Sequence, residues 1–447
     1  MFKKILSMFL ATLMVAGLCF AMSSCNKGEE PGTQNPAGVP DQEDGLTASP
    51  FPVATLNADF TVPAEFKVGF ILLHDEASTY DKNFMNGVES IKKALNLTDD
   101  QIIFKKNIPE SNECYEAAAD LVDLGCKAIF ANSFGHETYI LKAAKEFTDV
   151  QFCHATGTMA HTEKLANFHN AFASIYQGRY LAGVAAGLKL NEMIANGKIT
   201  ADKAKMGYIG AFTYAEVISG YTSFYLGAKS VCPTVTMDVT FTGSWYDETA
   251  EKNAAIKLIG DGCVLISQHA DSMGAPSACE EKGVPNVSYN GATVTACPNT
   301  FIVSSRIDWA PYYMHMIKNT IAGTDIGYDW CGDAVAGSVV LTGINEKAAA
   351  AGTLDKLTEV AGKLKSGEIK VFDTSTFTVT VDGTKNGNAT VDENGKLTGY
   401  MADVDTDAAF TADTQVVADG YFHESEYRSA PYFDIQIDGI NLLDTKF

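Results

Sequence analysis

Short apolar runs alternate with helix-like segments from residue 68 onward. The runs have the length and composition of buried strands, and the segments between them carry apolar residues at helical spacing. This alternation predicts a parallel sheet flanked by helices. The expected strands are 68–73, 102–105, 128–132, 150–154, 206–211, 237–241, 264–268, 284–289, 301–304 and 338–341. The helices expected between them include 83–95, 114–124, 177–195, 249–259 and 311–321.

The chain also repeats its own motifs across its middle. Lys67-Val-Gly-Phe-Ile is echoed by Lys205-Met-Gly-Tyr-Ile, and the segment 121–129 is echoed by 258–266. The offsets are 138 and 137 residues, so whole strand–helix units recur in order. Such a period is about one domain long and too long for a solenoid repeat. The sequence therefore predicts an α/β protein of two similar lobes with a cleft between them.

The N-terminus has the pattern of a bacterial lipoprotein signal. Lys3 and Lys4 precede a mostly apolar stretch over residues 5–22, and two small residues then lead to Cys25. We expect Cys25 to carry the lipid after residues 1–25 are recognised for export. A transmembrane anchor is the alternative, but it needs about 20 apolar residues, and polar residues interrupt this stretch.

Composition sets the rest of the organisation. Residues 26–62 are rich in Gly, Pro and polar residues and are expected to form a flexible tether. The remaining chain, roughly 385 residues, is long enough for two cores. We expect an N-terminal lobe over 63–175 with a return segment over 305–340, and a C-terminal lobe over 176–304 with a tail over 341–447. No later segment could span a bilayer, so the lipid would be the only membrane attachment.

The net charge limits the class of partner, and the cysteine spacing indicates the state of the thiols. The net charge of -22 argues against nucleic acid or an anionic membrane surface as a partner, because both attract cationic faces. Eight cysteines remain beyond Cys19 and Cys25, and none forms a Cys-x-x-Cys pair. Buried free thiols are expected for most of them, with one or two bridges left open.

Polar and aromatic residues gather directly after the expected strands. In open α/β sheets, ligands bind beyond the carboxyl ends of the strands. The 137-residue offset places Asn132 opposite His269 and Phe134 opposite Asp271. The candidate ligand-binding residues at these positions are Tyr80, Asp81, Phe84, Asn132, Ser133, Phe134, Trp245, His269, Asp271, Tyr289 and Asn290.

This mixture suits a planar, polar ligand. Two aromatic faces would sandwich a heterocycle, each adding about 0.5–1.5 kcal/mol beyond burial, while carboxylates and amides would hold its edge and any sugar hydroxyls. Trp245 is the preferred stacking residue because it follows a strand end between polar neighbours. Phe84 and Phe134 are equally compatible with the core, and Asp81 with a helix N-cap.

An enzyme is not expected. The chain has no Gly-x-Ser-x-Gly elbow, no phosphate-binding loop and no Gly-x-Gly-x-x-Gly after the first strand. His423, Glu424 and Glu426 lie close in sequence but lack the spacing of a metal site. No metal or cofactor is predicted. A receptor that passes its closed form to a membrane signalling protein would use the same cleft, so this alternative remains open.

Several motifs together resemble the basic membrane protein family of substrate-binding lipoproteins, which is related to purine nucleoside receptors of ABC importers. The residues that carry the resemblance span 67 to about 320 in order. They are Tyr80-Asp-Lys-Asn-Phe84, the segment 173–187, Lys205-Met-Gly-Tyr-Ile-Gly210, Gly243-Ser-Trp-Tyr-Asp247, Ile266-Ser-Gln-His-Ala-Asp-Ser272 and Arg306-Ile-Asp-Trp-Ala-Pro-Tyr-Tyr313.

The resemblance implies a type I periplasmic-binding-protein fold, with two doubly wound parallel-sheet lobes joined by a hinge. It further implies a monomer that closes on a purine nucleoside or nucleobase and delivers it to an ABC permease. Asp81 and Phe84 match the family's Asp-Lys-x-Phe segment, and Trp245 and Asp271 match a nucleobase-binding branch. Asn290 stands where nucleoside-binding members have an aspartate for ribose, and Arg306 stands where a lysine is common. Free base and nucleoside therefore both remain open.

The tail has a pattern of its own. Residues 377–381 alternate like a strand and end in an Asp-Gly turn, and residues 395–400 are the expected hairpin partner. The run 421–432 resembles family tails that return to the lobes.

Overall fold

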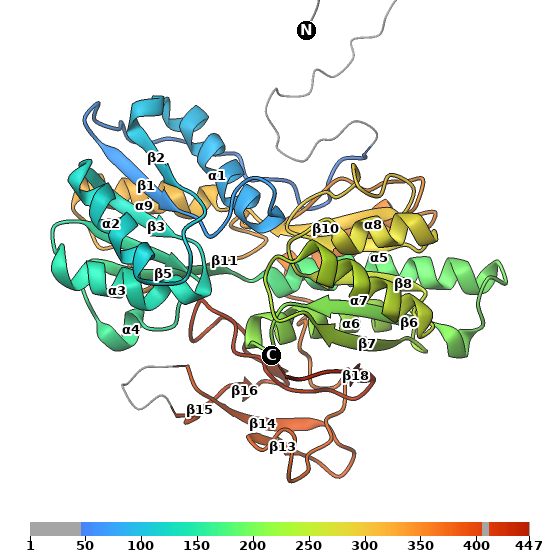
Figure 1. Ribbon diagram of the computed structural model, residues 1–447. Coiled ribbons are helices and arrows are strands. Elements are labelled where there is room, and N and C mark those ends of the chain that lie inside the picture. Colours follow the sequence, from blue (N-terminus) through green and yellow to red (C-terminus); the bar gives the residue numbers. More distant parts are fainter. Residues whose placement is uncertain (1–45, 405–410, 447) are drawn as a thin grey trace, which may run out of the picture. The chain divides into compact units, whose positions relative to one another are not determined.

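The first of two parallel β-sheets is built from the N-terminal part of the chain. The computed structural model describes residues 46–404 and 411–446 (Figure 1). The sheet has the order β11-β5-β4-β3-β1-β2, and all its strands are parallel. Its strands are β1 (Lys67–Ile71), β2 (Ile102–Lys105), β3 (Cys126–Ala131), β4 (Gln151–Ala155), β5 (Phe168–Ala173) and β11 (Asp329–Gly332). We call this sheet and its helices the N lobe.

The second sheet has the order β12-β10-β9-β8-β6-β7-β18. Only the pairing of β12 with β10 is antiparallel. Its strands are β6 (Lys205–Gly210), β7 (Thr236–Phe241), β8 (Leu265–His269), β9 (Asn286–Tyr289), β10 (Phe301–Ile307), β12 (Val339–Leu341) and β18 (Ile440–Leu442). We call this sheet and its helices the C lobe.

Helices cover both faces of each sheet. In the N lobe, α1 and α9 pack in one core while α2 and α3 pack in another, and in the C lobe α5 and α6 lie on the face opposite α7 and α8. The helices are α1 (Thr79–Leu95), α2 (Asn112–Asp123), α3 (Glu137–Glu146), α4 (Ala160–Glu163), α5 (Ile175–Ala195), α6 (Ala215–Val231), α7 (Glu248–Gly260), α8 (Gly274–Lys282), α9 (Ala310–Ala322) and α10 (Thr353–Lys365). The predicted α/β class with two doubly wound, parallel-sheet lobes is confirmed.

Three segments connect the lobes. They lie between β5 and α5, between β10 and α9, and between β11 and β12. The N-lobe sheet therefore uses residues 67–173 and 329–332, while the C-lobe sheet uses 205–307, 339–341 and 440–442. The predicted return segment 305–340 contains two of these connections.

Helices α5 and α6 approach each other unusually closely. A Cβ added at Gly183 would lie 2.0 Å from the carbonyl oxygen of Phe224, and one added at Gly227 would lie 2.0 Å from that of Tyr180. Glycine is therefore needed at both positions, because any side chain would push the two backbones apart.

Three strands of the two sheets, β5, β11 and β18, were not predicted, and the sequences of β5 and β11 lack the apolar signal. β5 contains His169 and Asn170, and both are buried. His169 Nδ1 lies 2.7 Å from the carbonyl oxygen of Gly327, and Asn170 Nδ2 donates to Glu137 at 3.0 Å. Partners distant in sequence thus allow these polar residues inside the sheet. β11 is equally mixed, with the sequence DWCG.

The tail hairpin was predicted with the wrong partner. β14 (Leu397–Ala402) pairs with β13 (Ala389–Val391) and with β15 (Thr414–Gln415). Residues 377–381 form no strand and contact the predicted partner segment through the N–H of Val379, which donates to the carbonyl of Gly395 at 2.7 Å. The turn forms at Asp392, whose Oδ1 accepts the backbone N–H groups of Asn394 and Lys396. Thr378 and Thr380 instead donate to Asp438. A second short ribbon joins β16 (Val417–Ala418) to β17 (Tyr421–Phe422).

The predicted tether of 26–62 is described only from residue 46, and Cys25 lies outside the described residues. Residues 46–62 run along the lobes. The N–H of Thr47 donates to the carbonyl of Ile344 at 3.0 Å, Phe51 is buried, and Lys318 pairs with Asp59 at 2.6 Å. This part of the segment is therefore packed against the protein.

All eight described cysteines are free thiols, and seven are buried. Among the described residues, no helix combines the length and apolarity needed to cross a bilayer.

Candidate functional site

A cavity of about 370 Å³ lies at the carboxyl ends of strands from both sheets. Its wall is formed by residues that follow strands, or that begin the helices after them. The lining residues are Leu73, His74, Tyr80, Ser133, Phe134, Thr156, Glu216, Trp245, His269, Asp271 and Asn290. Both lobes contribute residues to this wall.

The structure brings most of the predicted site residues to this wall. Those that line the cavity are Tyr80, Ser133, Phe134, Trp245, His269, Asp271 and Asn290. Those that are not part of its lining are Asp81, Phe84, Asn132, Tyr289 and Arg306. All five residues of this second group are buried.

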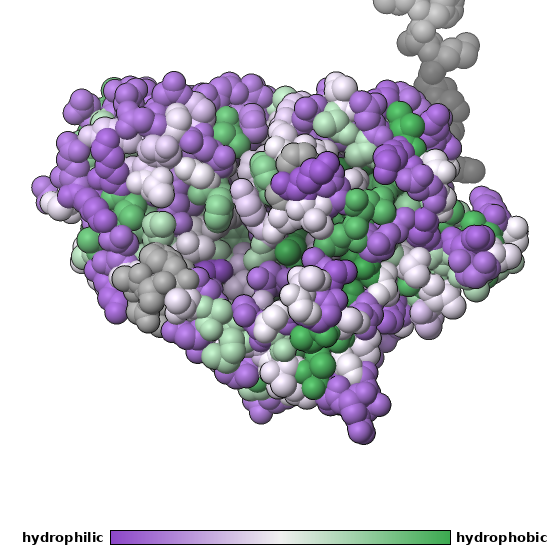
Figure 2. Space-filling model, turned by 60° about the horizontal axis from the view of Figure 1, so that its bottom comes forward, coloured by the Kyte–Doolittle hydropathy of each residue, from purple (hydrophilic) through white to green (hydrophobic). Residues whose placement is uncertain are grey.

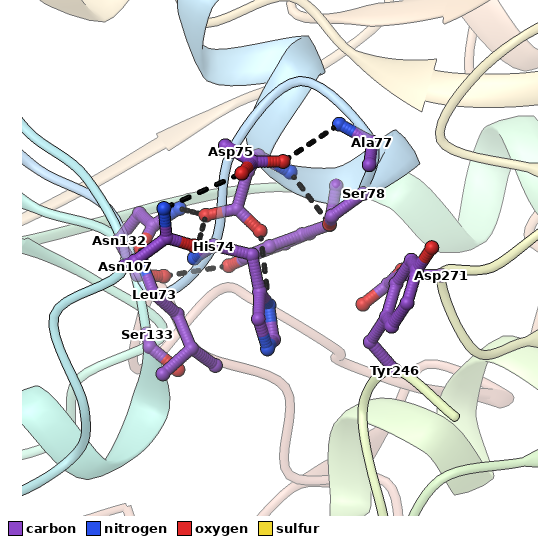
Figure 3. Close-up of polar contacts among 12 residues, drawn as sticks. Leu73, His74, Asp75, Ala77, Ser78, Asn107, Asn132, Ser133, Tyr246 and Asp271 are labelled. Atoms are coloured by element: carbon purple, nitrogen blue, oxygen red, sulfur yellow. Dashed lines mark hydrogen bonds and ion pairs between the residues drawn. The ribbon is translucent and has the colours of Figure 1, made fainter. Parts of the chain in front are cut away.

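Asp81 lies behind the lining of the N lobe. Its Oδ1 accepts the backbone N–H of His74 at 3.1 Å and the side-chain N–H of Asn132 at 2.8 Å, and the His74 ring lies 3.4 Å from Oδ2 (Figure 3). Burial alone would raise the pKa of Asp81, but the hydrogen bonds from His74, Asn132 and Ser78 outweigh it and hold the pKa below its ordinary value. Asp81 is thus a charged anchor for the His74 loop.

The alternatives for Asp81 and Phe84 are resolved by local geometry. Ser78, not Asp81, is the N-cap of α1, because its side chain accepts the N–H of Asp81. Phe84 is fully buried and stacks on Trp309 with ring centroids 4.4 Å apart, so it belongs to the core. Phe134, in contrast, is 40% exposed.

Asn132, Tyr289 and Arg306 also act from behind the wall. The side-chain oxygen of Asn132 accepts a hydrogen bond from the N–H of Leu73, and its backbone carbonyl accepts one from the Tyr80 hydroxyl. The ring of Tyr289 lies 4.4 Å from that of His269. Arg306 donates to the side-chain oxygen of Asn83 at 3.3 Å.

Asp271 is the main acid of the C lobe. It is 4% exposed, and its Oδ1 accepts the side-chain N–H of Asn290 at 3.1 Å. Burial, reinforced by the nearby carboxylates of Glu251 and Asp81, raises the pKa of Asp271 well above its usual range. The raised pKa favours the neutral acid, which can donate a hydrogen bond as well as accept one. Figure 3 shows it across from His74, beside Tyr246.

A polar chain supports the floor of the cavity. The buried guanidinium of Arg179 donates to the Tyr208 hydroxyl at 3.1 Å, which lies 3.4 Å from His269 Nδ1. His269 Nε2 lies 3.4 Å from Glu216 Oε1. Burial lowers the pKa of His269 despite Glu216, which favours the opposite direction, so the ring is held neutral.

Aromatic rings surround the outer part of the cavity. Phe134 of the N lobe lies 5.1 Å from Tyr214 of the C lobe, and Phe212 meets Trp245 edge-on at 5.1 Å. These contacts keep the rings of Phe134 and Trp245 fixed at the cavity wall, ready to pack against a flat ligand.

Some lining residues were not selected from the sequence. These residues are Leu73, His74, Thr156 and Glu216. Each follows a strand or begins a helix, so its position in the sequence pointed to the site. Their residue types alone did not mark them as ligand-binding residues. Arg179 was detectable as a lone charge in an otherwise small and apolar stretch of α5.

Comparisons with known proteins agree with this architecture. A family model described as an ABC transporter substrate-binding protein, PnrA-like, matches residues 71–375. A purine-binding protein of Brucella abortus is 32% identical over 266 residues, which cover 58% of this chain and 70% of that protein. A Haloferax volcanii protein named as an ABC transporter glucose-binding protein is 29% identical over 211 residues, and the chain spans 49% of its length.

Solved structures show the same fold. An ABC transporter solute-binding protein from Aeropyrum pernix matches with a TM-score of 0.57 and 15% identity, over 71% of this chain and 95% of that one. One from Conexibacter woesei matches with a TM-score of 0.55 and 20% identity, over 68% and 98%. The family model covers most of the chain, and the resemblance predicted from the motifs is confirmed. This protein belongs to the PnrA-like family of ABC transporter substrate-binding proteins, which are binding proteins and not enzymes.

Proposed function

We propose that this protein captures a purine nucleobase or purine nucleoside in the cavity between its lobes and presents it to the permease of an ABC importer. The observation that carries the proposal is the pairing of aromatic rings with a buried acid in one cavity. Phe134 and Trp245 offer flat apolar faces, while Asp271 offers a hydrogen-bonding edge.

The polar groups suit the edge of a purine. A purine ring presents both hydrogen-bond acceptors and, in most forms, N–H donors. A neutral Asp271 can both donate and accept a hydrogen bond. Groups that are neutral in a dry cavity lose less solvation energy than charged ones, so they can bind an uncharged ring without a counter-ion.

Ligand capture follows from the placement of the wall on two lobes. A ligand that contacts both lobes binds the closed form better than the open form, so it shifts the population towards closure. The relative from Brucella abortus is named for purine binding, which supports this ligand class. The relative from Haloferax volcanii is named for glucose, which makes sugars the necessary comparison.

Calorimetry on protein freed of bound ligand tests the proposal. The protein is unfolded in guanidinium, dialysed, refolded and titrated with adenine, guanine, hypoxanthine, adenosine, inosine and glucose. We expect at least one purine to bind with a stoichiometry of one, and glucose not to bind. Binding of glucose alone, or of none of the purines, would refute the proposal.

We also propose that the protein is exported as a monomer and held to the cell membrane by lipid on Cys25. The signal-like N-terminus supports this arrangement. Fractionation of cells that express the wild-type protein or Cys25→Ser tests it. The wild type should remain with the membrane fraction and the variant should not, whereas equal membrane association would exclude an anchor at Cys25.

A further inference from the structure

A second cavity adjoins the ligand cavity and has the C-terminal tail as one wall. It spans about 560 Å³, part of which is open to solvent, and it shares Phe134, Thr156 and Glu216 with the first cavity. We call it the vestibule. Its other walls are Thr158 of the N lobe, Tyr214 and Ala215 of the C lobe, and Arg428, Ala430 and Pro431 of the tail.

The tail wall is held by both lobes. The N–H of Ser429 donates to Asp329 Oδ1 at 2.9 Å, which attaches the wall to strand β11 of the N lobe. Farther along the tail, β18 pairs with β7 of the C lobe. The guanidinium of Arg428 donates to the carbonyls of Asp403 and Pro431, at 3.2 and 3.1 Å. Figure 1 shows a red segment of the tail running between the ribbons of the two lobes.

The opposite wall is a strained and firmly anchored loop. Thr156 has a φ of 65°, which is unusual for a β-branched residue. Glu137 accepts the N–H groups of Thr158 and Met159 at 2.7 and 2.9 Å, so the loop cannot relax easily. Backbone strain of this kind persists only where the surrounding structure imposes it, and it concentrates at ligand sites.

Glu216 stands where the two cavities meet. Its side chain is 12% exposed and lies in the first turn of α6, with Oε1 near His269. A carboxylate accepts hydroxyl hydrogen bonds more strongly than an amide does. Glu216 can therefore hold a hydroxyl-bearing group that leaves the first cavity, a role for which Asn290 is less suited.

These contacts lead to one inference, which rests on the proposed purine ligand. We infer that residues 428–431 of the tail are a specificity-determining part of the site. The purine ring occupies the first cavity, and a substituent on the ring passes Glu216 into the vestibule, where it packs against Ala430 and Pro431. Figure 2 shows the side of the molecule that Figure 1 has at the bottom, with polar residues over most of the surface and hydrophobic ones towards its middle.

Filling the vestibule tests the inference. Ala430→Phe, in the buried tail wall, should lower the affinity for adenosine by about tenfold or more, as expected from steric overpacking. Its affinity for adenine should stay within about twofold, because the first cavity is unchanged. Ala418→Phe is the matched control, since Ala418 is exposed on the same tail and lines neither cavity. It should change neither affinity.

A second variant guards against a folding defect. Thr158→Phe fills the vestibule from the N lobe, where Thr158 lines only this cavity. It should reproduce the selective loss of adenosine binding in protein whose thermal unfolding is cooperative. Equal losses for adenine and adenosine, or no loss in either variant, would overturn the inference. Wild-type protein that binds adenine but not adenosine would overturn the inference alone, whereas wild-type protein that binds no purine would overturn the proposed function with it.

Discussion

Thr79 and Asp271 join the two lobes through a single carbonyl oxygen. The backbone N–H and the hydroxyl of Thr79 donate to the Asp271 carbonyl at 3.0 and 3.1 Å. Thr79 begins α1 of the N lobe, and Asp271 follows β8 of the C lobe. Because the contact bridges the two lobes, moving the lobes apart would break it. It therefore contributes to the free energy of closure on the same loop that carries the main acid of the site.

Removing one of these bonds should weaken ligand binding. Thr79→Val loses the hydroxyl but keeps the N–H donor, so closure should lose about 0.5–1.5 kcal/mol, equivalent to a two- to tenfold higher Kd for a purine. Calorimetry would measure it. Thr358→Val is the control, because this exposed hydroxyl bonds only within α10. An unchanged Kd in Thr79→Val would show that the contact does not stabilise the closed form.

Trp245 should provide an aromatic face to the ligand. Trp245→Ala should raise the Kd for a bound purine about tenfold or more, because both the stacking energy and the buried area are lost. Trp245→Phe keeps a smaller flat face and should recover most of the affinity. Fluorescence quenching of wild-type tryptophan on titration gives an independent signal. Equal affinities for the alanine and phenylalanine variants would argue against stacking at this position.

Glu251 should make stability depend on pH. Burial raises its pKa from 4.5 to about 7, although the N–H groups of Ser272 and Asp247 oppose the shift. Between these values the folded protein holds a proton that the unfolded chain has lost, so the free energy of unfolding should fall as the pH rises from about 4.5 to about 7. The full loss is about 3 kcal/mol.

Denaturant unfolding at several pH values measures this effect. Glu251→Gln, which cannot ionise, should lose the part of the slope that Glu251 causes, about 3 kcal/mol, and should be relatively more stable above pH 7. The buried carboxyl of Glu424, whose pKa is raised to about 8, should keep its own part of the slope. Glu248→Gln is the control, because Glu248 is an exposed residue at the start of the same helix. A wild-type slope that persists in Glu251→Gln would assign the pH dependence to another group.

Close packing of α5 on α6 should make the free energy of unfolding sensitive to any side chain added between them. Gly183→Ala would place a Cβ 2.0 Å from a backbone oxygen, so it should lower the free energy of unfolding by about 1–3 kcal/mol or more. Gly362→Ala lies in α10 with no atom within 4 Å of the new Cβ, so it should raise stability by up to about 1 kcal/mol. Thermal unfolding distinguishes the two. Similar effects at both positions would mean that the helices can move apart freely.

Much of the fold could be predicted from the chain because its signals are local. Apolar strands such as β1 and β8 are continuous buried runs, and helices such as α1 show a clear amphipathic period. β5 and β11 lacked that signal, since their polar residues are satisfied by partners far away in sequence. The tail hairpin was misassigned because an Asp-Gly pair marks a turn without identifying which strands it joins.

The candidate site, too, could be predicted only in part from the sequence. Position after a strand was enough to select Trp245 and Asp271, because parallel strands bring their carboxyl ends to one edge. Which of two neighbouring residues lines the cavity was not determined by position. Asp81 and Phe84 lie behind the wall, while His74 and Glu216 lie on it, and this follows from helix rotation and loop shape.

The sequence by itself therefore determined the duplicated α/β lobes and the family resemblance, and it predicted an export signal and a ligand site at one edge of the sheets. Only the tertiary structure decided which side chains face the cavity, which acid has its pKa raised by burial, and that the tail forms one wall of a second cavity. The physical reason is the separation along the chain between the residues that interact. Strand and helix patterns depend on neighbours within a few residues, whereas burial, pKa shifts and cavity walls depend on contacts such as Thr79 with Asp271 or Ser429 with Asp329, between residues far apart along the chain.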